Sequence, residues 1–199
     1  WKRVIYGEIL PGIELDELQQ RRGALDIPLA KELLAQAAEG VGAAHQAGVV
    51  HRDVKPSNMV LLEGHDERVL KLLDFGLAKP NLLTVDPVMT TAEDFVGTCY
   101  YMSPEQVIGS ASVDARSDVW SLGVVAYQML TGRLPFEGRC TMEVCSAIVQ
   151  TPVGSVRDVR PEVPERLAWL VMACLQRTPD RRFPDAVALA RALRALAES

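Results

Sequence analysis

The stretch His51-Arg52-Asp53-Val54-Lys55-Pro56-Ser57-Asn58 concentrates the chemically reactive side chains of this 199-residue sequence. An acid is followed two residues later by a base and five residues later by an amide, and Asp74-Phe75-Gly76 begins sixteen residues after that amide. A carboxylate can orient a hydroxyl group and accept its proton, an ammonium can neutralise a phosphoryl group, and amide and carboxylate oxygens suit Mg²⁺. The pattern therefore indicates a loop that handles a polyphosphate.

Four further motifs follow in order along the chain. They are Gly97-Thr98, Ser103-Pro104-Glu105, Ser117-Asp118-Val119-Trp120-Ser121-Leu122-Gly123 and Arg182. With the first stretch, they make the sequence similar to the C-terminal lobe (C-lobe) of eukaryotic-type serine/threonine protein kinases, including the bacterial members of that superfamily. A single triplet such as Asp-Phe-Gly occurs by chance, but the ordered set is specific and covers nearly the whole chain.

The resemblance implies a role for each polar residue of the first stretch. Asp53 would be the catalytic base, and Lys55 would contact the γ-phosphate of ATP and favour Ser/Thr over Tyr acceptors. Asn58 and Asp74 would hold Mg²⁺. Taken singly, these residues have ordinary alternatives: an aspartate that caps a helix or forms a turn, a solvated lysine and a turn-forming asparagine.

The resemblance also implies where adenine binds and how the chain divides. Residues 3–15 resemble the last strand of the N-terminal lobe (N-lobe) and the hinge, so the backbone at Glu8 and Leu10 would meet adenine. Val60 would lie under the adenine ring, or would simply be a core residue of a strand. We expect three segments: residues 1–14 as N-lobe strand and hinge, residues 15–199 as C-lobe, and within it residues 74–105 as activation segment.

Regulation is predicted within that activation segment. Arg52, beside the catalytic aspartate, is typical of kinases that are switched by phosphorylation of the segment, because a phosphate there would pair with the arginine and order the loop. Thr90 and Thr91 are the candidate sites, and unmodified loop threonines are the alternative. Thr98 would hydrogen-bond the catalytic loop.

A second set of residues would support the site without reacting: His51, Phe75, Gly76, Glu105, Asp118 and Arg182. His51 and Phe75 would pack in the hydrophobic column that joins the lobes. Glu105 and Arg182 would form a buried ion pair. Asp118 would accept hydrogen bonds from the backbone of the His51-Arg52 turn.

Hydrophobic periodicity predicts a mainly α fold that contains one small β-hairpin. The resemblance implies that this is the C-lobe of a protein-kinase-like fold, which is α+β when the full kinase domain is counted. Asp26 and Pro28 mark the start of a long helix that ends before Gly48, and Gly132 stops a second one. The predicted helices are Leu15–Arg22, the helix after Asp26, 117–131, 141–150, 164–176 and 184–197. The predicted strands are the end of one at 3–6 and the hairpin Met59–Leu62 with Val69–Leu73.

Composition excludes several function classes. Apolar residues make up 48% and charged residues 24% of the chain, as in a soluble globular domain. The 21 basic and 26 acidic residues give a net charge of −5, which disfavours nucleic acid as a partner. The apolar runs are too short for a transmembrane helix, so we expect no membrane contact within this segment. Four cysteines without a C-x-x-C pair argue against a zinc site and favour a reducing, cytoplasmic location.

The sequence contains no Gly-rich phosphate loop and no strand lysine of the V-A-x-K type. We therefore expect an N-lobe in the full-length chain, an expectation that the start at Trp1 favours, and little activity from these 199 residues alone. The expected partners are ATP and proteins with Ser/Thr acceptors. The alternative is a free-standing C-lobe that acts as a pseudokinase-like binding or scaffold module. A small-molecule phosphotransferase is disfavoured, because 97–105 and the Asp118 helix resemble a peptide-substrate platform.

We also expect an exposed apolar surface where the N-lobe would dock, near Leu10, Val60 and Phe75.

Overall fold

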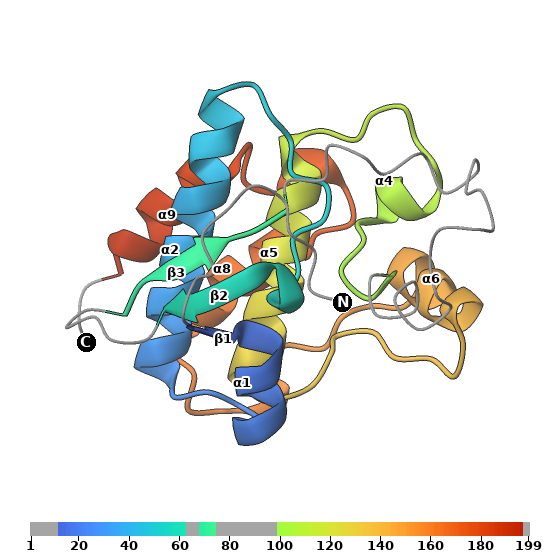
Figure 1. The fold of residues 1–199 in the computed structure, drawn as a ribbon. Helices are drawn as coiled ribbons and strands as arrows, with labels where there is room; N and C mark the ends of the chain where they lie inside the picture. Colours follow the sequence, from blue (N-terminus) through green and yellow to red (C-terminus); the bar gives the residue numbers. More distant parts are fainter. Residues whose placement is uncertain (1–11, 63–67, 75–98, 197–199) are drawn as a thin grey trace, which may run out of the picture.

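The structure is a computed structural model, and it describes residues 12–62, 68–74 and 99–196. Helices dominate it, with one small sheet (Figure 1). The elements are β1 (Gly12–Glu14), α1 (Leu15–Arg22), α2 (Ile27–Gln46), the 3-10 turn η1 (Pro56–Asn58), β2 (Met59–Leu62), β3 (Leu70–Leu72), α4 (Pro104–Val107), α5 (Ala115–Thr131), α6 (Thr141–Gln150), α7 (Val156–Val159), α8 (Glu165–Cys174), the 3-10 turn η3 (Pro179–Arg181) and α9 (Ala186–Arg194).

The long helices α2 and α5 form the centre of the fold. They pack against each other, and α9 covers another side of α2 (Figure 1). The apolar positions that predict α2 from the sequence, such as Leu33 and Val41, are fully buried. Thirteen of the 17 residues of α5 are buried, because α2, α7, α8 and α9 pack against it. These two helices provide the rigid base on which the loop at residues 51–58 rests.

The boundaries of the long helices follow local signals. Pro28 lies in the first turn of α2, where its missing N–H costs nothing. The side chain of Asp114 accepts a hydrogen bond from Arg116 N and caps α5. Gly132 ends α5 at a φ of 70°, a left-handed conformation that glycine adopts without strain. Both long helices are thus confirmed, with α5 beginning two residues earlier than predicted.

The sheet has three antiparallel strands in the order β1-β2-β3. The predicted hairpin is confirmed as β2 and β3, and β1 adds a third strand that the sequence analysis did not predict. Gly12 permits the close pairing, because a Cβ there would lie 2.5 Å from the carbonyl oxygen of Leu61. Three residues are too few to show the alternation by which strands are recognised.

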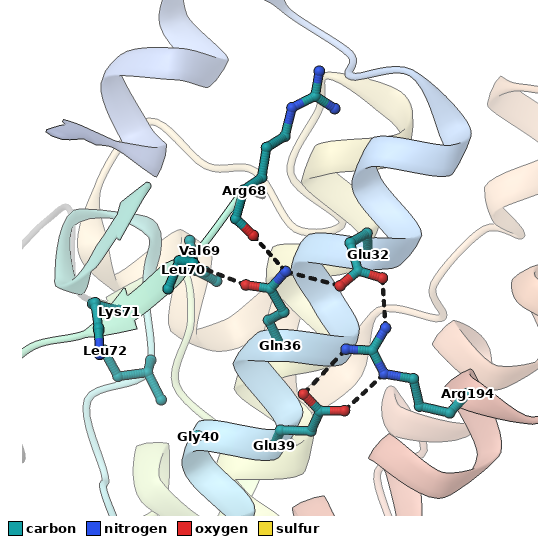
Figure 2. A pocket seen from close by; sticks show the side chains of 10 residues that line it. All are labelled: Glu32, Gln36, Glu39, Gly40, Arg68, Val69, Leu70, Lys71, Leu72 and Arg194. Atoms are coloured by element: carbon teal, nitrogen blue, oxygen red, sulfur yellow. Dashed lines mark hydrogen bonds and ion pairs between the residues drawn. The ribbon is translucent and has the colours of Figure 1, made fainter. Parts of the chain in front are cut away.

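A polar groove of about 560 Å³ lies between α2, β3 and α9 (Figure 2). Gln36 on α2 donates to the carbonyl of Arg68 and accepts from the N–H of Leu70, so its amide satisfies the outer edge of the sheet. Arg194 of α9 bridges Glu32 and Glu39 on α2 (Figure 2). These contacts attach β3 and α9 to α2. The reactive residues of 51–58 do not line the groove.

Two further observations concern the described residues as a whole. All four cysteines lie among them and are free thiols. None of the helices in 12–62, 68–74 and 99–196 combines the length and apolar character that crossing a bilayer requires.

Candidate active site

The loop at residues 51–58 connects α2 to β2 and has a strained backbone at Arg52. The φ of this residue is 64°, a left-handed conformation that costs a residue with a side chain about 1–2 kcal/mol. Such a conformation persists only where neighbouring groups hold it. The groups that hold Arg52 therefore determine where the next residue, Asp53, is placed.

Asp118 on α5 is the first of these groups. Its carboxylate is almost fully buried and accepts hydrogen bonds from His51 N at 2.7 Å and Arg52 N at 2.8 Å. The predicted support of the turn by Asp118 is thus confirmed. Because Asp118 lies in the first turn of α5, its hydrogen bonds attach the loop directly to this helix.

His45, at the end of α2, extends this support to α9. Its Nε2 lies 2.8 Å from Asp118 Oδ2, and its Nδ1 accepts a hydrogen bond from Ala186 N at 3.2 Å. Since Nδ1 is the acceptor, the hydrogen-bond network assigns the ring proton to Nε2, which donates to Asp118. The sequence analysis missed His45, because its contacts involve residues 73 and 141 positions away.

Asp53, Lys55 and Asn58 come together within this loop. Lys55 Nζ lies 3.3 Å from Asp53 Oδ2, and Asn58 Nδ2 donates to Asp53 O at 2.8 Å and to Asp53 Oδ2 at 3.2 Å. The side chains of Asp53 and Lys55 are 10% and 18% exposed, so both are largely enclosed while still reaching solvent. An ammonium and an amide thus both lie close to the same carboxylate oxygen, an arrangement suited to moving a proton beside a phosphoryl group.

Asp74 is brought to the same end of the sheet. Leu73 N donates to Asn58 O at 2.8 Å, which extends the β2–β3 pairing to the residue before Asp74. Asp74 itself is exposed, with a φ of 51°. The bonds to Asp53 use Asn58 Nδ2 and leave out its side-chain oxygen. This amide oxygen and the Asp74 carboxylate are two oxygen donors at this end of the sheet whose chemistry can be compared with that of a metal ligand. Both are hard oxygen ligands, the type that Mg²⁺ prefers.

The one-turn helix α4 lies beside the loop and is fixed by a capping box. Ser103 Oγ accepts from Gln106 N, and Gln106 Oε1 accepts from Ser103 N. The other end of the Gln106 amide donates to Arg52 O at 3.1 Å. The sequence analysis did not single out Gln106, although Ser-x-x-Gln is a recognisable capping signal.

Glu105 and Arg182 anchor α4 to the helical base. They form the predicted buried pair, with N–O distances of 2.7 and 2.9 Å, and Ser117 Oγ donates to Glu105 at 2.6 Å. Burial acts to raise the pKa of Glu105, but the hydrogen bonds from Arg182 and Ser117 outweigh it and hold the pKa below its usual value. Arg182 also lies 5.0 Å above the ring of Trp120, which adds a cation–π contact.

The remaining predicted site residues are placed as follows. His51 is fully buried, and the side chain of Arg52 is exposed. Val60 is only 7% exposed. The prediction of an exposed apolar surface is therefore wrong at Val60. Strand β1 pairs with β2 and covers this side chain so closely that a Cβ on Gly12 would lie 2.7 Å from Val60 Cγ1. The other candidates fall outside the described residues: Glu8, Leu10, Phe75, Gly76, Thr90, Thr91 and Thr98.

Comparison with known proteins agrees with this geometry. The family profile of the protein kinase domain matches residues 2–192. The chain is 37% identical over 193 residues to the serine/threonine-protein kinase drp72 of Corynebacterium efficiens, covering 95% of this chain and 34% of that protein. It is 36% identical over 191 residues to the serine/threonine-protein kinase PknL of Mycobacterium tuberculosis, covering 96% and 46%. The chain thus spans between about a third and a half of the length of these relatives.

A solved structure shows the same fold. The crystal structure of the Mycobacterium tuberculosis PknI kinase domain superposes with a TM-score of 0.69 at 24% sequence identity, covering 94% of this chain and 63% of that chain. The ordered motifs, the fold and the family profile lead to the same conclusion. The chain belongs to the protein kinase family.

Proposed function

We propose that this chain carries the catalytic lobe of a protein serine/threonine kinase, which transfers the γ-phosphate of ATP to Ser/Thr hydroxyl groups of proteins. The observation that carries the proposal is the fixed contact of Asp53 with Lys55 and Asn58, on a loop held by Asp118. A turn-forming aspartate needs no enclosed lysine beside it.

Each of these residues has a distinct task in the proposed reaction. Asp53 orients the acceptor hydroxyl and takes its proton at a carboxylate oxygen. Lys55, 3.3 Å from that carboxylate, lies close enough to neutralise charge on the phosphoryl group as it moves. Asn58 holds both the backbone and the carboxylate of Asp53, which fixes the base before the substrate arrives.

Asn58 and Asp74 would hold Mg²⁺ through their side-chain oxygens. When bound, the ion supplies positive charge that neutralises the phosphates of ATP. The pairing of Leu73 with Asn58 supports this assignment, because it ties the segment before Asp74 to the loop that carries Asn58.

Adenine recognition and regulation extend the proposal. We assign the hinge contact to Glu8 and Leu10 within residues 1–14, with Val60 beneath the adenine ring and residues 15–199 as C-lobe. Residues 74–105 would act as the activation segment, with Thr90 and Thr91 as modification sites and Thr98 as the expected hydrogen-bond partner of the catalytic loop. The exposed Arg52 supports this, because its guanidinium is accessible to a phosphate. The proposed location is cytoplasmic.

The 199 residues contain no Gly-rich loop and no V-A-x-K lysine. Phosphoryl transfer depends mainly on positioning and electrostatic stabilisation, so this chain by itself should turn over slowly. A protein that supplies those parts should be fully active.

The test measures transfer of radiolabelled γ-phosphate from ATP to a generic basic protein by the protein at its full natural length. Asp53→Asn should lower kcat by about 10²–10⁴-fold, the range typical of a lost general base. Asp26→Asn is the matched control, since Asp26 is exposed and its side chain makes no cap hydrogen bond at α2. A wild-type protein that binds ATP or partners but transfers no phosphate would favour the binding-module alternative.

A further inference from the structure

The peptide group that joins Arg52 to Asp53 is held at both of its polar ends by side chains. Its N–H, on Asp53, donates to His51 Nδ1 at 3.3 Å. Its carbonyl, on Arg52, accepts from Gln106 Nε2 at 3.1 Å. This is the peptide group immediately before the proposed base, so its orientation determines the direction in which the Asp53 side chain leaves the backbone.

The Gln106 amide is itself fixed from the opposite side. Its Oε1 accepts from Ser103 N at 3.0 Å and lies 3.2 Å from Ser103 Oγ, within the capping box of α4. One planar amide therefore uses its acceptor to hold α4 and its donor to hold the catalytic loop. A carboxylate of the same shape could keep the first contact but not the second, because it has no N–H.

We propose that Gln106 is a positioning residue for Asp53, which fixes the base through the Arg52 carbonyl and makes its placement depend on α4. The inference rests on the proposed kinase function. Arg52 has a left-handed φ of 64°, so the loop gains by relaxing when an anchor is lost. Asp118 holds the N–H groups of His51 and Arg52, whereas Gln106 holds the carbonyl that follows them.

The test compares Gln106→Glu with Gln150→Glu in the protein at its full natural length. Both substitutions add one negative charge, and Gln150 lies exposed at the end of α6. Gln106→Glu should lower kcat by about tenfold, because the base is no longer held, while KM for ATP stays within about twofold. Gln150→Glu should leave kcat unchanged. Amide hydrogen exchange should quicken at residues 51–53 of Gln106→Glu and nowhere else.

The pH dependence of kcat is a second measurement, and it would not change if Gln106 only stabilised the fold. A protonated carboxylic acid regains an O–H donor, so the kcat deficit of Gln106→Glu relative to wild type should shrink as the pH approaches about 4.5. Gln106→Met lacks the donor and also the acceptor for Ser103, and it adds no charge. It should reproduce the kcat loss without recovering at low pH, with faster exchange at residues 51–53 and in α4. This second variant decides the matter if Gln106→Glu does not fold.

The proposal is overturned if Gln106→Glu and Gln106→Met match Gln150→Glu in kcat, or if their hydrogen exchange rises uniformly over the protein. If the wild-type protein itself transfers no phosphate, the proposed function fails, but the exchange experiment still decides this contact. Faster exchange confined to residues 51–53 of Gln106→Glu supports it, and unchanged exchange there refutes it.

Discussion

At the scale of single residues, the carboxylate of Asp118 meets three donors in a buried setting: His51 N, Arg52 N and the His45 ring. Asp118→Asn replaces one carboxylate oxygen by an NH₂ group, which faces a donor and leaves it without an acceptor. The free energy of unfolding should fall by about 2–3 kcal/mol, the cost of leaving a buried donor unpaired beside a lost charged acceptor.

Urea denaturation measures this loss, with exposed Asp26→Asn as the control. Hydrogen exchange should also quicken at His51 and Arg52. Unchanged stability in Asp118→Asn would mean that the loop keeps its shape without the carboxylate.

A substitution at Gln19 on α1 should raise stability, whereas Asp118→Asn should lower it. It is 6% exposed, and neither amide atom has a hydrogen-bond partner among the residues that the structure describes. Burying an unpaired amide is unfavourable, so Gln19→Met, which has a similar shape, should raise the free energy of unfolding by about 1 kcal/mol. Gln20→Met, on the exposed face of the same helix, is the control for helix propensity, and it loses only an exposed hydrogen bond to Asp16. A loss of stability in Gln19→Met would show that the amide is satisfied in solution.

At the scale of elements, the Glu105–Arg182 pair joins α4 to the segment between η3 and α9. The pKa of Glu105 lies below the usual value of 4.5, so the folded protein binds this proton less readily than the unfolded chain does. The stability from the pair is therefore fully present above about pH 4.5 and is lost as the pH falls through the lowered value. Glu105→Gln should flatten this acid limb and cost about 3–5 kcal/mol at pH 7, because it leaves Arg182 buried without its partner charge.

Thermal unfolding between pH 3 and pH 7 provides the measurement. Glu165→Gln, at the exposed start of α8, should leave the acid limb as steep as in wild type. An equally steep limb in Glu105→Gln would assign the acid sensitivity to other carboxylates.

The elements also show what the sequence could and could not predict. The long helices have repeated apolar positions with Pro28 and Gly132 as end signals, so α2 and α5 were predictable almost to the residue. The strand β1 and the helices α4 and α7 have three or four residues each, too few for a period to show.

The site divides in a similar way. The tasks proposed for Asp53 and Asn58, and the support of the loop by Asp118, follow from motifs in a recognisable order. The contacts of His45 with Asp118 and of Gln106 with Arg52 join residues at least 54 positions apart and depend on how helices pack, which no local pattern encodes. Arg52 adds a left-handed φ at a residue type that sequence rules would not place there.

At the scale of the whole molecule, the anchors of the loop at residues 51–58 come from three parts of the chain: α2 through His45, α4 through Gln106 and α5 through Asp118. One continuous hydrophobic core joins these parts, from Leu15 on α1 to Leu193 on α9. The geometry at Asp53 is therefore a property of the folded core and is not set by the loop alone.

The single hydrophobic core predicts how the cysteine thiols react with an alkylating reagent. Cys140 is exposed and should react in the native protein, whereas Cys99 and Cys174 are buried. Burial raises the pKa of Cys99 to about 11 and that of Cys174 to about 12, so little thiolate exists at neutral pH. Because both thiols belong to one core, they should become reactive at the same urea concentration, together with the loss of helical circular dichroism. Mass spectrometry of labelled peptides provides the measurement, and labelling of Cys99 before Cys174 would show that the part before α4 opens independently.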